Sequence, residues 1–101
     1  MSIASHLSQD GQELTLVIKG RFDFGLLPAF KQAYEKTNTP PTRYVVDLAQ
    51  AEYLDSSALG MLLALRDHAG GDDSQISIQH CNANIKKILN VTKLNELFAI
   101  E

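Results

Sequence analysis

Only one cysteine, Cys81, occurs in the chain, and long apolar runs are absent as well. A lone cysteine excludes an internal disulfide framework and fits a reducing cytosol. The longest apolar run, residues 58–65, falls far short of the ~20 residues that a membrane-spanning helix needs. The first eight residues carry neither the basic nor the apolar segment of a secretory signal peptide. We therefore expect a cytoplasmic protein that does not insert into a membrane.

Positive charge is also scarce, because nine lysines and arginines are outnumbered by twelve acidic residues. The net charge is −3, and only Lys86 and Lys87 form an adjacent basic pair. This balance argues against a surface for direct nucleic-acid binding. The hydrophobic content of 45% is sufficient for a packed core, and 101 residues is a common size for one domain. We therefore interpret residues 1–101 as a single domain.

The residues that metal or covalent catalysis would need are not suitably spaced. His6, His68 and His80 lie in separate predicted elements, so we expect no metal site. A hydrolytic triad of Ser57, a histidine and Asp23 would need a Gly-x-Ser-x-Gly elbow, which the sequence lacks. His68 also follows Ser57 by eleven residues on one predicted helix, a rise of about 16 Å. A glycine-rich phosphate loop is missing too. We expect no cofactor and no enzymatic activity.

Apolar residues recur with periods that predict alternating strands and helices. Asp10-Gly11 is a strong turn signal between two short strands, so the chain is expected to open with a β-hairpin. The order β-β-α-β-α-β-α then predicts an α/β domain with a mixed sheet flanked by helices. The expected strands are 3–8, 13–19, 44–48 (buried on both faces) and 76–78; the expected helices are 26–36 (stopped by residues 39–42), 57–69 and 84–90; residues 94–100 form a closing element of unassigned type.

The second helix, residues 57–69, is apolar nearly all round in its first two turns and ends at Gly70-Gly71. This pattern predicts a helix packed against the sheet with little exposure. Gly60 and Ala64 lie four residues apart, which gives a stripe of small side chains that another element could approach closely. A glycine costs ~1 kcal/mol inside a helix, so we expect a packing or functional reason for Gly60.

Three polar residues, Asp55, Ser56 and Ser57, stand together before this apolar helix. All three are good N-cap types, and simple capping is one interpretation. One cap is enough for one helix, however, which leaves at least one hydroxyl group free. Backbone N–H groups and the helix dipole favour an anion at this position. A phosphate of about −1.5 to −2 charge could be accepted there, beside Asp55 and Asp23, and would change a partner surface rather than the fold.

The segment Asp55-Ser56-Ser57-Ala58-Leu59-Gly60 resembles the signature of STAS-domain anti-sigma factor antagonists, a family of bacterial regulators. The family pattern is Asp-Ser-Ser-Gly-Leu-Gly, and alanine replaces its first glycine here. The turn over residues 20–23, the strands at 45–48 and 76–78, and the helix at 85–89 resemble the rest of the family in order and spacing. The resemblance implies a STAS fold with a sheet of four or five strands flanked by helices.

The resemblance also implies a switch. The phosphorylated residue of the family matches Ser57, with Ser56 as the alternative. Asp23 and Asp55 match acidic positions near it that are implicated in partner binding or phosphorylation. The resemblance thus implies a partner-binding surface made of Asp23, Asp55, Ser56 and Ser57. The donor would be ATP bound to a serine kinase, often the anti-sigma factor itself, and a PP2C-type phosphatase would reverse the step. Unphosphorylated, the protein would bind the anti-sigma factor and free a sigma factor to act in transcription.

Two alternatives keep the same fold. The chain could be a constitutive STAS subunit of an ABC transporter complex, or a STAS regulator of a signalling enzyme. The transporter subunit would act without phosphorylation of Ser57, whereas the second role would place the protein on a signalling enzyme rather than in a sigma-factor pathway.

Overall fold

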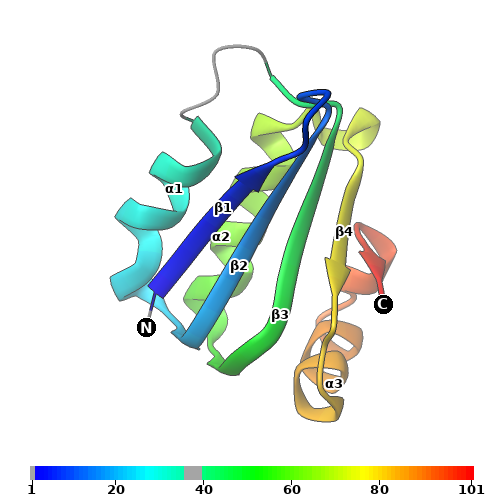
Figure 1. Ribbon diagram of the computed structural model, residues 1–101. Coiled ribbons are helices and arrows are strands. Elements are labelled where there is room, and N and C mark those ends of the chain that lie inside the picture. The colour runs from blue at the N-terminus through cyan, green and yellow to red at the C-terminus, as the bar shows by residue number, and fades with distance from the viewer. Residues whose placement is uncertain (1, 36–39) are drawn as a thin grey trace.

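The computed structural model describes residues 2–35 and 40–101, which form an α/β fold (Figure 1). The expected mixed sheet is confirmed, with five strands that lie in the order of the sequence, β1-β2-β3-β4-β5. β1 and β2 form the antiparallel hairpin, and every later pair is parallel. The strands are β1 (Ser2–Leu7), β2 (Glu13–Phe22), β3 (Arg43–Leu54), β4 (Ile76–Gln79) and β5 (Ala99–Ile100); the α-helices of the described residues are α1 (Leu27–Glu35), α2 (Ser56–His68) and α3 (Ala83–Val91).

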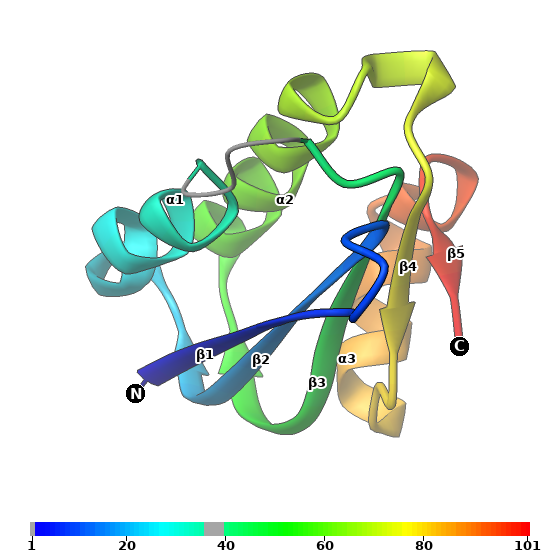
Figure 2. The same ribbon diagram turned by 45° about the horizontal axis from the view of Figure 1, so that its top comes forward.

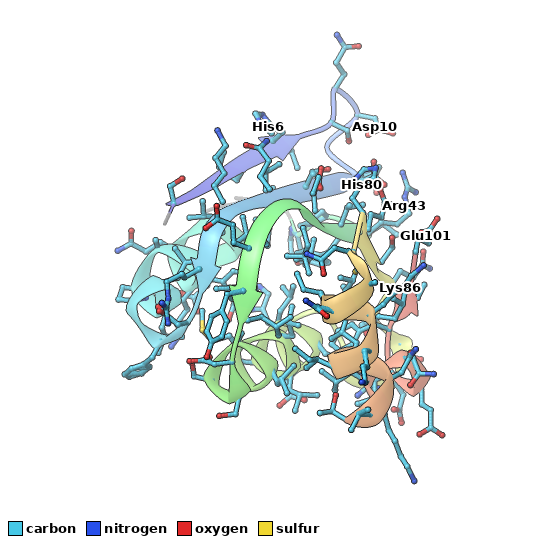
Figure 3. The ribbon with its side chains drawn as sticks, turned by 90° about the horizontal axis from the view of Figure 1, so that it is seen from below. His6, Asp10, Arg43, His80, Lys86 and Glu101 are labelled. Atoms are coloured by element: carbon cyan, nitrogen blue, oxygen red, sulfur yellow. The ribbon has the colours of Figure 1, made fainter. Side chains whose placement is uncertain are left out.

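All three α-helices lie on one side of the sheet, and the other side is open (Figures 1 and 2). Each helix connects two neighbouring parallel strands. Such crossovers are right-handed almost without exception. Because every crossover here steps in the same direction across the sheet, all of the helices must fall on the same face. Figure 3 shows this from below, with His6 on the side away from the helices.

One hydrophobic core fills the space between the sheet and the helices. Alternate residues of β2 and β3, such as Leu16 and Val46, point into it and are fully buried. On α1, Phe30 and Tyr34 are buried. The Phe30 ring lies 5.3 Å from that of Phe22 and 5.5 Å from that of Tyr34, in the tilted and edge-on geometries that aromatic rings prefer. The predicted helix end at residue 36 and part of the stop at 39–42 lie outside the described residues.

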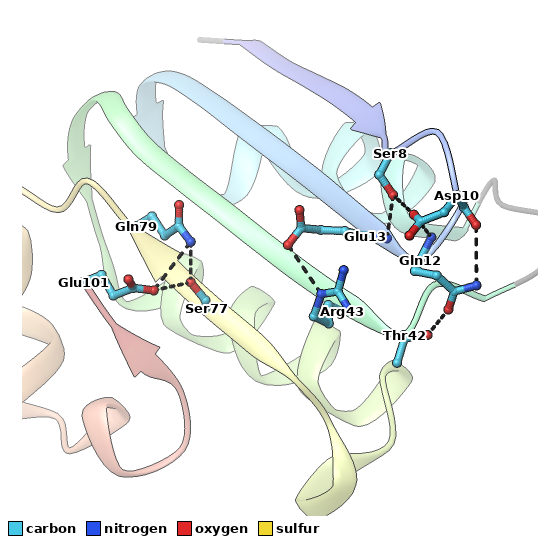
Figure 4. Close-up of polar contacts among 9 residues, drawn as sticks. All are labelled: Ser8, Asp10, Gln12, Glu13, Thr42, Arg43, Ser77, Gln79 and Glu101. Carbon is cyan, nitrogen blue, oxygen red and sulfur yellow. Dashed lines mark hydrogen bonds and ion pairs between the residues drawn. The ribbon is translucent and has the colours of Figure 1, made fainter.

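The turn between β1 and β2 is stabilised by side chains as well as by glycine. Gly11 has a φ of +72°, which glycine adopts without strain. Oδ1 of Asp10 accepts hydrogen bonds from the Ser8 hydroxyl at 2.6 Å and from the Gln12 amide at 3.0 Å (Figure 4). The Ser8 oxygen in turn accepts the Glu13 amide at 3.0 Å. The Asp-Gly signal therefore located the hairpin correctly.

The expectation that α2 would be buried nearly all round is wrong. Gly60, Leu63 and Ala64 are exposed, and 40% of the Leu63 surface is accessible. A Cβ atom added at Gly60 would meet nothing within 4 Å. A helix that covers one side of a sheet is itself covered only on its inner side, where Leu62 and Leu65 are fully buried. The stripe of small residues therefore faces outward from the fold.

β3 is also longer and more one-sided than the sequence indicated. It continues beyond the expected end at Leu48 to Leu54. Val45 is buried on the open side, but Asp47 is half-buried and Ala49 is exposed, so burial on both faces holds only for the first residues. The untyped segment at 94–100 proves to be a short 3-10 turn (Leu94–Glu96) followed by β5.

Candidate functional site

The carboxyl ends of β2 and β3 bring the two predicted acidic residues to the same edge of the sheet. Phe22 is the register partner of Leu54, and the Asp55 amide donates to the Phe22 carbonyl oxygen at 3.4 Å. Asp23 and Asp55 are the next residues along each strand. Their proximity therefore follows from the parallel pairing, although they are far apart in the sequence.

Asp55 is the N-cap of α2. Its backbone is extended, with φ −115° and ψ −174°, and its Oδ1 atom accepts the Ala58 amide at 3.1 Å. The hydroxyl of Ser57 donates to the same oxygen at 2.5 Å. This hydrogen bond is the main reason that the pKa of Asp55 is lowered, with the Ala58 amide contributing in the same direction. Among the three cap candidates in the sequence, the carboxylate takes the cap and Ser57 attaches to it.

Ser56 and Ser57 differ in their surroundings even though they are neighbours. Ser56 is the first residue of α2 and is exposed. Ser57 is half-buried, and its hydroxyl is held against the Asp55 carboxylate. The first-turn N–H groups of a helix and its dipole both favour negative charge. A group transferred to the Ser57 oxygen would therefore sit at the positive end of α2 but beside an existing carboxylate.

Asp23 has a capping role of its own. It accepts the Gly25 amide at 3.0 Å and so begins the 3-10 turn at Phe24–Leu26. Its second oxygen lies 3.5 Å from Nε of Arg21, an ion pair whose arginine is largely exposed. An exposed pair of this kind contributes little to stability. Its effect is to fix the position of the carboxylate at the end of β2.

The sequence interpretation missed two exposed aromatic side chains at this edge. Phe24 follows Asp23 and is 65% exposed, and Tyr53 precedes Leu54 and is 44% exposed. The Arg21 guanidinium lies 4.6 Å from the centre of the Tyr53 ring, a cation–π contact between paired strands. For Phe24 one signal was available in the sequence, because it directly follows the polar turn residue Asp23. Arg21 thus links Asp23 with Tyr53.

The other residues weighed in the sequence do not join this site. His80 contacts Asp47 at 3.0 Å on the open side of the sheet, and the His68 ring packs against Tyr34 at 4.8 Å. Cys81 is half-buried, and burial raises the pKa of its thiol. Within residues 2–35 and 40–101, no three histidine, cysteine or acidic side chains are grouped as metal ligands. None of the helices in this part of the chain is long and apolar enough to cross a membrane.

Comparison with known sequences identifies a family and one close relative. Residues 5–99 match the protein family described as "Mlab, STAS domain". A STAS-domain containing protein of Pseudomonas aeruginosa (strain UCBPP-PA14) is 56% identical over 100 residues, which cover 99% of each chain.

Solved structures with the same fold include regulators and a transporter-family protein. A protein assigned as an anti-sigma factor antagonist from Thermotoga maritima superposes with a TM-score of 0.82 at 16% identity, over 97% of this chain and 84% of that one. The phosphorylated form of the Bacillus cell fate determinant SpoIIAA gives 0.69 at 10% identity, over 99% and 91%. A sulfate transporter family protein from Wolinella succinogenes gives 0.71 at 13% identity, over 84% and 74%. At these identities the likeness establishes the fold alone.

Proposed function

Because this chain belongs to the STAS-domain family, we propose that it is an anti-sigma factor antagonist that works by partner switching. Unphosphorylated, it binds a kinase-type anti-sigma factor and so frees a sigma factor. When that kinase transfers the terminal phosphate of its bound ATP to Ser57, the protein dissociates from the anti-sigma factor. A PP2C-type phosphatase then removes the phosphate and restores the form that binds. The protein itself catalyses nothing. The fold that it shares with SpoIIAA, which is known in a phosphorylated form, supports this assignment.

The observation that carries the proposal is the hydrogen bond of 2.5 Å between the Ser57 hydroxyl and the Asp55 carboxylate. This hydrogen bond holds the Ser57 side chain in one rotamer at the start of α2. The Asp55 carboxylate accepts the hydroxyl proton and so polarises the O–H bond. An oriented hydroxyl beside a carboxylate is a suitable nucleophile for phosphoryl transfer, because that reaction depends mainly on positioning and charge stabilisation. Ser56 is exposed and makes no such contact within the described residues.

Phosphorylation would act on binding rather than on folding. To change the ratio of bound to free protein from 99:1 to 1:99, phosphorylation must weaken the binding free energy by ~5.5 kcal/mol. Repulsion between the phosphate and Asp55 exists in both states, so by itself it cannot supply that difference. The greater part must come from removing water around a group of about −2 charge when the interface closes. Loss of water also strengthens the repulsion from Asp23 and Asp55 in the complex.

Exposed apolar side chains at this edge and on the outer face of α2 supply attraction in the unphosphorylated state. Phe24, Tyr53 and Leu63 are 65%, 44% and 40% exposed. Aromatic residues are frequent binding hot spots, and hot spots are commonly surrounded by polar groups that exclude water when the complex forms. Asp23 and Asp55 provide such a polar surround, and an acidic surround favours a partner with basic side chains at its rim.

The test uses the purified kinase-type anti-sigma factor of the same organism, with ATP, and intact-mass and peptide mass spectrometry. The expected result is one phosphate, on Ser57, with none on Ser57→Ala and full modification of the control Ser56→Ala. In the absence of ATP, Ser57→Ala should bind the kinase as wild type does, whereas Ser57→Asp should bind at least tenfold more weakly. Phosphate on Ser56 alone, or equal binding of Ser57→Asp and wild type, would show the switch to be wrong.

A sulfate transporter family protein shares the fold, and the alternative role is a constitutive STAS subunit of an ABC transporter complex. That role predicts copurification with a membrane-associated ATPase, unchanged by Ser57→Ala and Ser57→Asp. A regulator of a signalling enzyme would instead alter the activity of that enzyme in a reconstituted assay. Insensitivity to both Ser57 substitutions separates the transporter role from the switch.

A further inference from the structure

The first strand, β1, forms one edge of the sheet, and among the described residues no strand lies on its outer side (Figure 1). It is six residues long, which corresponds to ~20 Å, whereas β5 at the opposite edge has only two residues. Ser5, His6 and Leu7 are exposed. An edge strand presents a row of backbone N–H and C=O groups with which another strand can pair. The β1 edge is therefore where this sheet can be extended.

The register of the hairpin determines which backbone groups of β1 point outward. The Ser8 amide donates to the Glu13 carbonyl oxygen at 2.9 Å, and the pairing with β2 continues from there along β1 without a shift. Residues of an antiparallel strand alternate between bonding to the neighbouring strand and pointing away from it. The even-numbered residues of β1 therefore bond to β2. The N–H and C=O groups of Ile3, Ser5 and Leu7 point outward, and they have no hydrogen-bond partner among the described residues.

The features by which proteins protect an edge strand are missing from β1. Those features include proline, charged side chains (lysine above all), a β-bulge and a very short strand. The sequence of β1 is Ser-Ile-Ala-Ser-His-Leu, without proline, lysine, arginine or an acidic residue, and its pairing with β2 contains no bulge. Leu7 is also 49% exposed. A second copy of the same strand can therefore approach without repulsion between lysines or carboxylates.

We propose that β1 pairs antiparallel with β1 of a second copy, which joins the two sheets into one. The outward groups match when Ser5 lies opposite Ser5 of the second copy on a twofold axis. Ile3 then lies opposite Leu7 of the second copy, and each of these pairs exchanges two backbone hydrogen bonds. Ile3 packs against the core, on the helix side of the sheet, so it covers the exposed leucine with apolar surface.

The other face of the paired strands is compatible with this register. His6 lies on the side of the sheet away from the helices, and Ala4 is on the same face. In the dimer each His6 lies opposite Ala4 of the second copy, so the two imidazole rings do not meet. Because both copies use the same patch, the contact closes as a dimer. An interface made mainly of one strand is small, so we expect a dimer that forms at micromolar or higher concentration.

The experiment is sedimentation velocity of the full chain from about 10 µM to about 1 mM, where the sedimentation coefficient should rise with concentration. Ser5→Pro removes an N–H group that only the dimer uses, and an edge strand accepts proline at such a position, so this variant should stay monomeric. Ser5→Lys places two like charges opposite each other and should dimerise at least tenfold more weakly. Ser5→Thr is the matched control and should dimerise as wild type does. Circular dichroism shows that each variant is folded.

Cysteine cross-linking tests the register, in a Cys81→Ser background. Ser5→Cys should form a disulfide-linked dimer on oxidation, because paired residues at the axis have Cα atoms ~5.5 Å apart, within the ~4.4–6.8 Å that disulfides span. Ser2→Cys should not, because the two Ser2 positions are six residues apart along the paired strands, or ~20 Å.

Three results would each overturn the proposal. A monomer at every concentration would leave the β1 edge to a strand of another protein. A dimer that is unaffected by both Ser5→Pro and Ser5→Lys would place the interface elsewhere. Equal cross-linking of Ser5→Cys and Ser2→Cys would contradict the register. The Ser57 switch would stand in every case, because β1 contributes no residue to it.

Discussion

Replacing Asp55 with alanine tests the arrangement at the start of α2 most directly. The substitution removes the acceptor of the Ala58 amide at 3.1 Å and of the Ser57 hydroxyl at 2.5 Å. Loss of an N-cap costs about 1 kcal/mol, within a range of roughly 0.5–2 kcal/mol. Ser57 is half-buried and stays close to water, so its lost hydrogen bond should add little. We therefore expect the free energy of unfolding to fall by ~1–2 kcal/mol.

The measurement is urea unfolding followed by far-UV circular dichroism, together with a thermal scan. For a domain of this size, 1 kcal/mol corresponds to a fall in Tm of about 4–8 °C. Asp55→Asn keeps a capping oxygen and removes the charge, so it should lose less stability than Asp55→Ala. Ser56→Ala is the matched control in the same turn and should change stability by less than ~0.5 kcal/mol. If Asp55→Ala unfolded like wild type, the capping argument would be refuted.

Three further predictions concern the rest of the fold. Leu62 is fully buried, so Leu62→Ala should lower the free energy of unfolding, measured in urea, by ~2–5 kcal/mol. Leu63 is exposed, so Leu63→Ala should change that free energy by no more than ~0.5 kcal/mol but should weaken partner binding measured by calorimetry. Gly60→Ala should stabilise the protein by up to ~1 kcal/mol, while Gly70→Ala, at φ +116°, should destabilise it by more than ~1 kcal/mol; thermal scans that rank them otherwise would contradict the glycine geometry. The hydrogen bond from the Ser8 hydroxyl is the main cause of the lowered pKa of Asp10. The ionised Asp10 carboxylate therefore stabilises the folded protein at pH values above its ordinary pKa of 3.8, and this stabilisation is lost as the pH falls through the lower pKa of the folded state. Ser8→Ala should therefore move the midpoint of acid unfolding to higher pH, and an unchanged midpoint would count against that hydrogen bond.

Local sequence patterns predicted most of the helices and strands well, because turn residues and apolar periodicity act over a few neighbouring residues. The alternation of Leu14, Leu16 and Ile18, the Asp-Gly turn and the apolar face of α1 need only the sequence around them. The far half of β3 was missed because its residues, Ala49 to Tyr53, include the helix-favouring Ala-Gln-Ala-Glu. They become a strand by pairing with β2, across two register irregularities that no local pattern indicates.

The candidate site was predicted in part. The sequence identified Asp55, Ser56 and Ser57 as a group but could not assign the cap, because all three residue types serve equally well. Side-chain direction decides this, and the structure gives the cap to Asp55. The exposure of Gly60 and Leu63 could not be predicted either, since it depends on which side of the sheet the other helices occupy. Only the strand order, together with the handedness of the crossovers, determines that side.

The agreement between strand order and sequence order has a consequence for how the chain reaches its fold. No strand has to be inserted between two others that already pair, so the sheet can grow from one edge as the chain leaves the ribosome. Each new strand finds its template in the one synthesised just before it. The same order leaves the last addition weakest, because β5 has only two residues and one neighbouring strand. Local opening of the native protein should therefore begin at that edge, and the amides of β5 should exchange with solvent hydrogen long before those of β3.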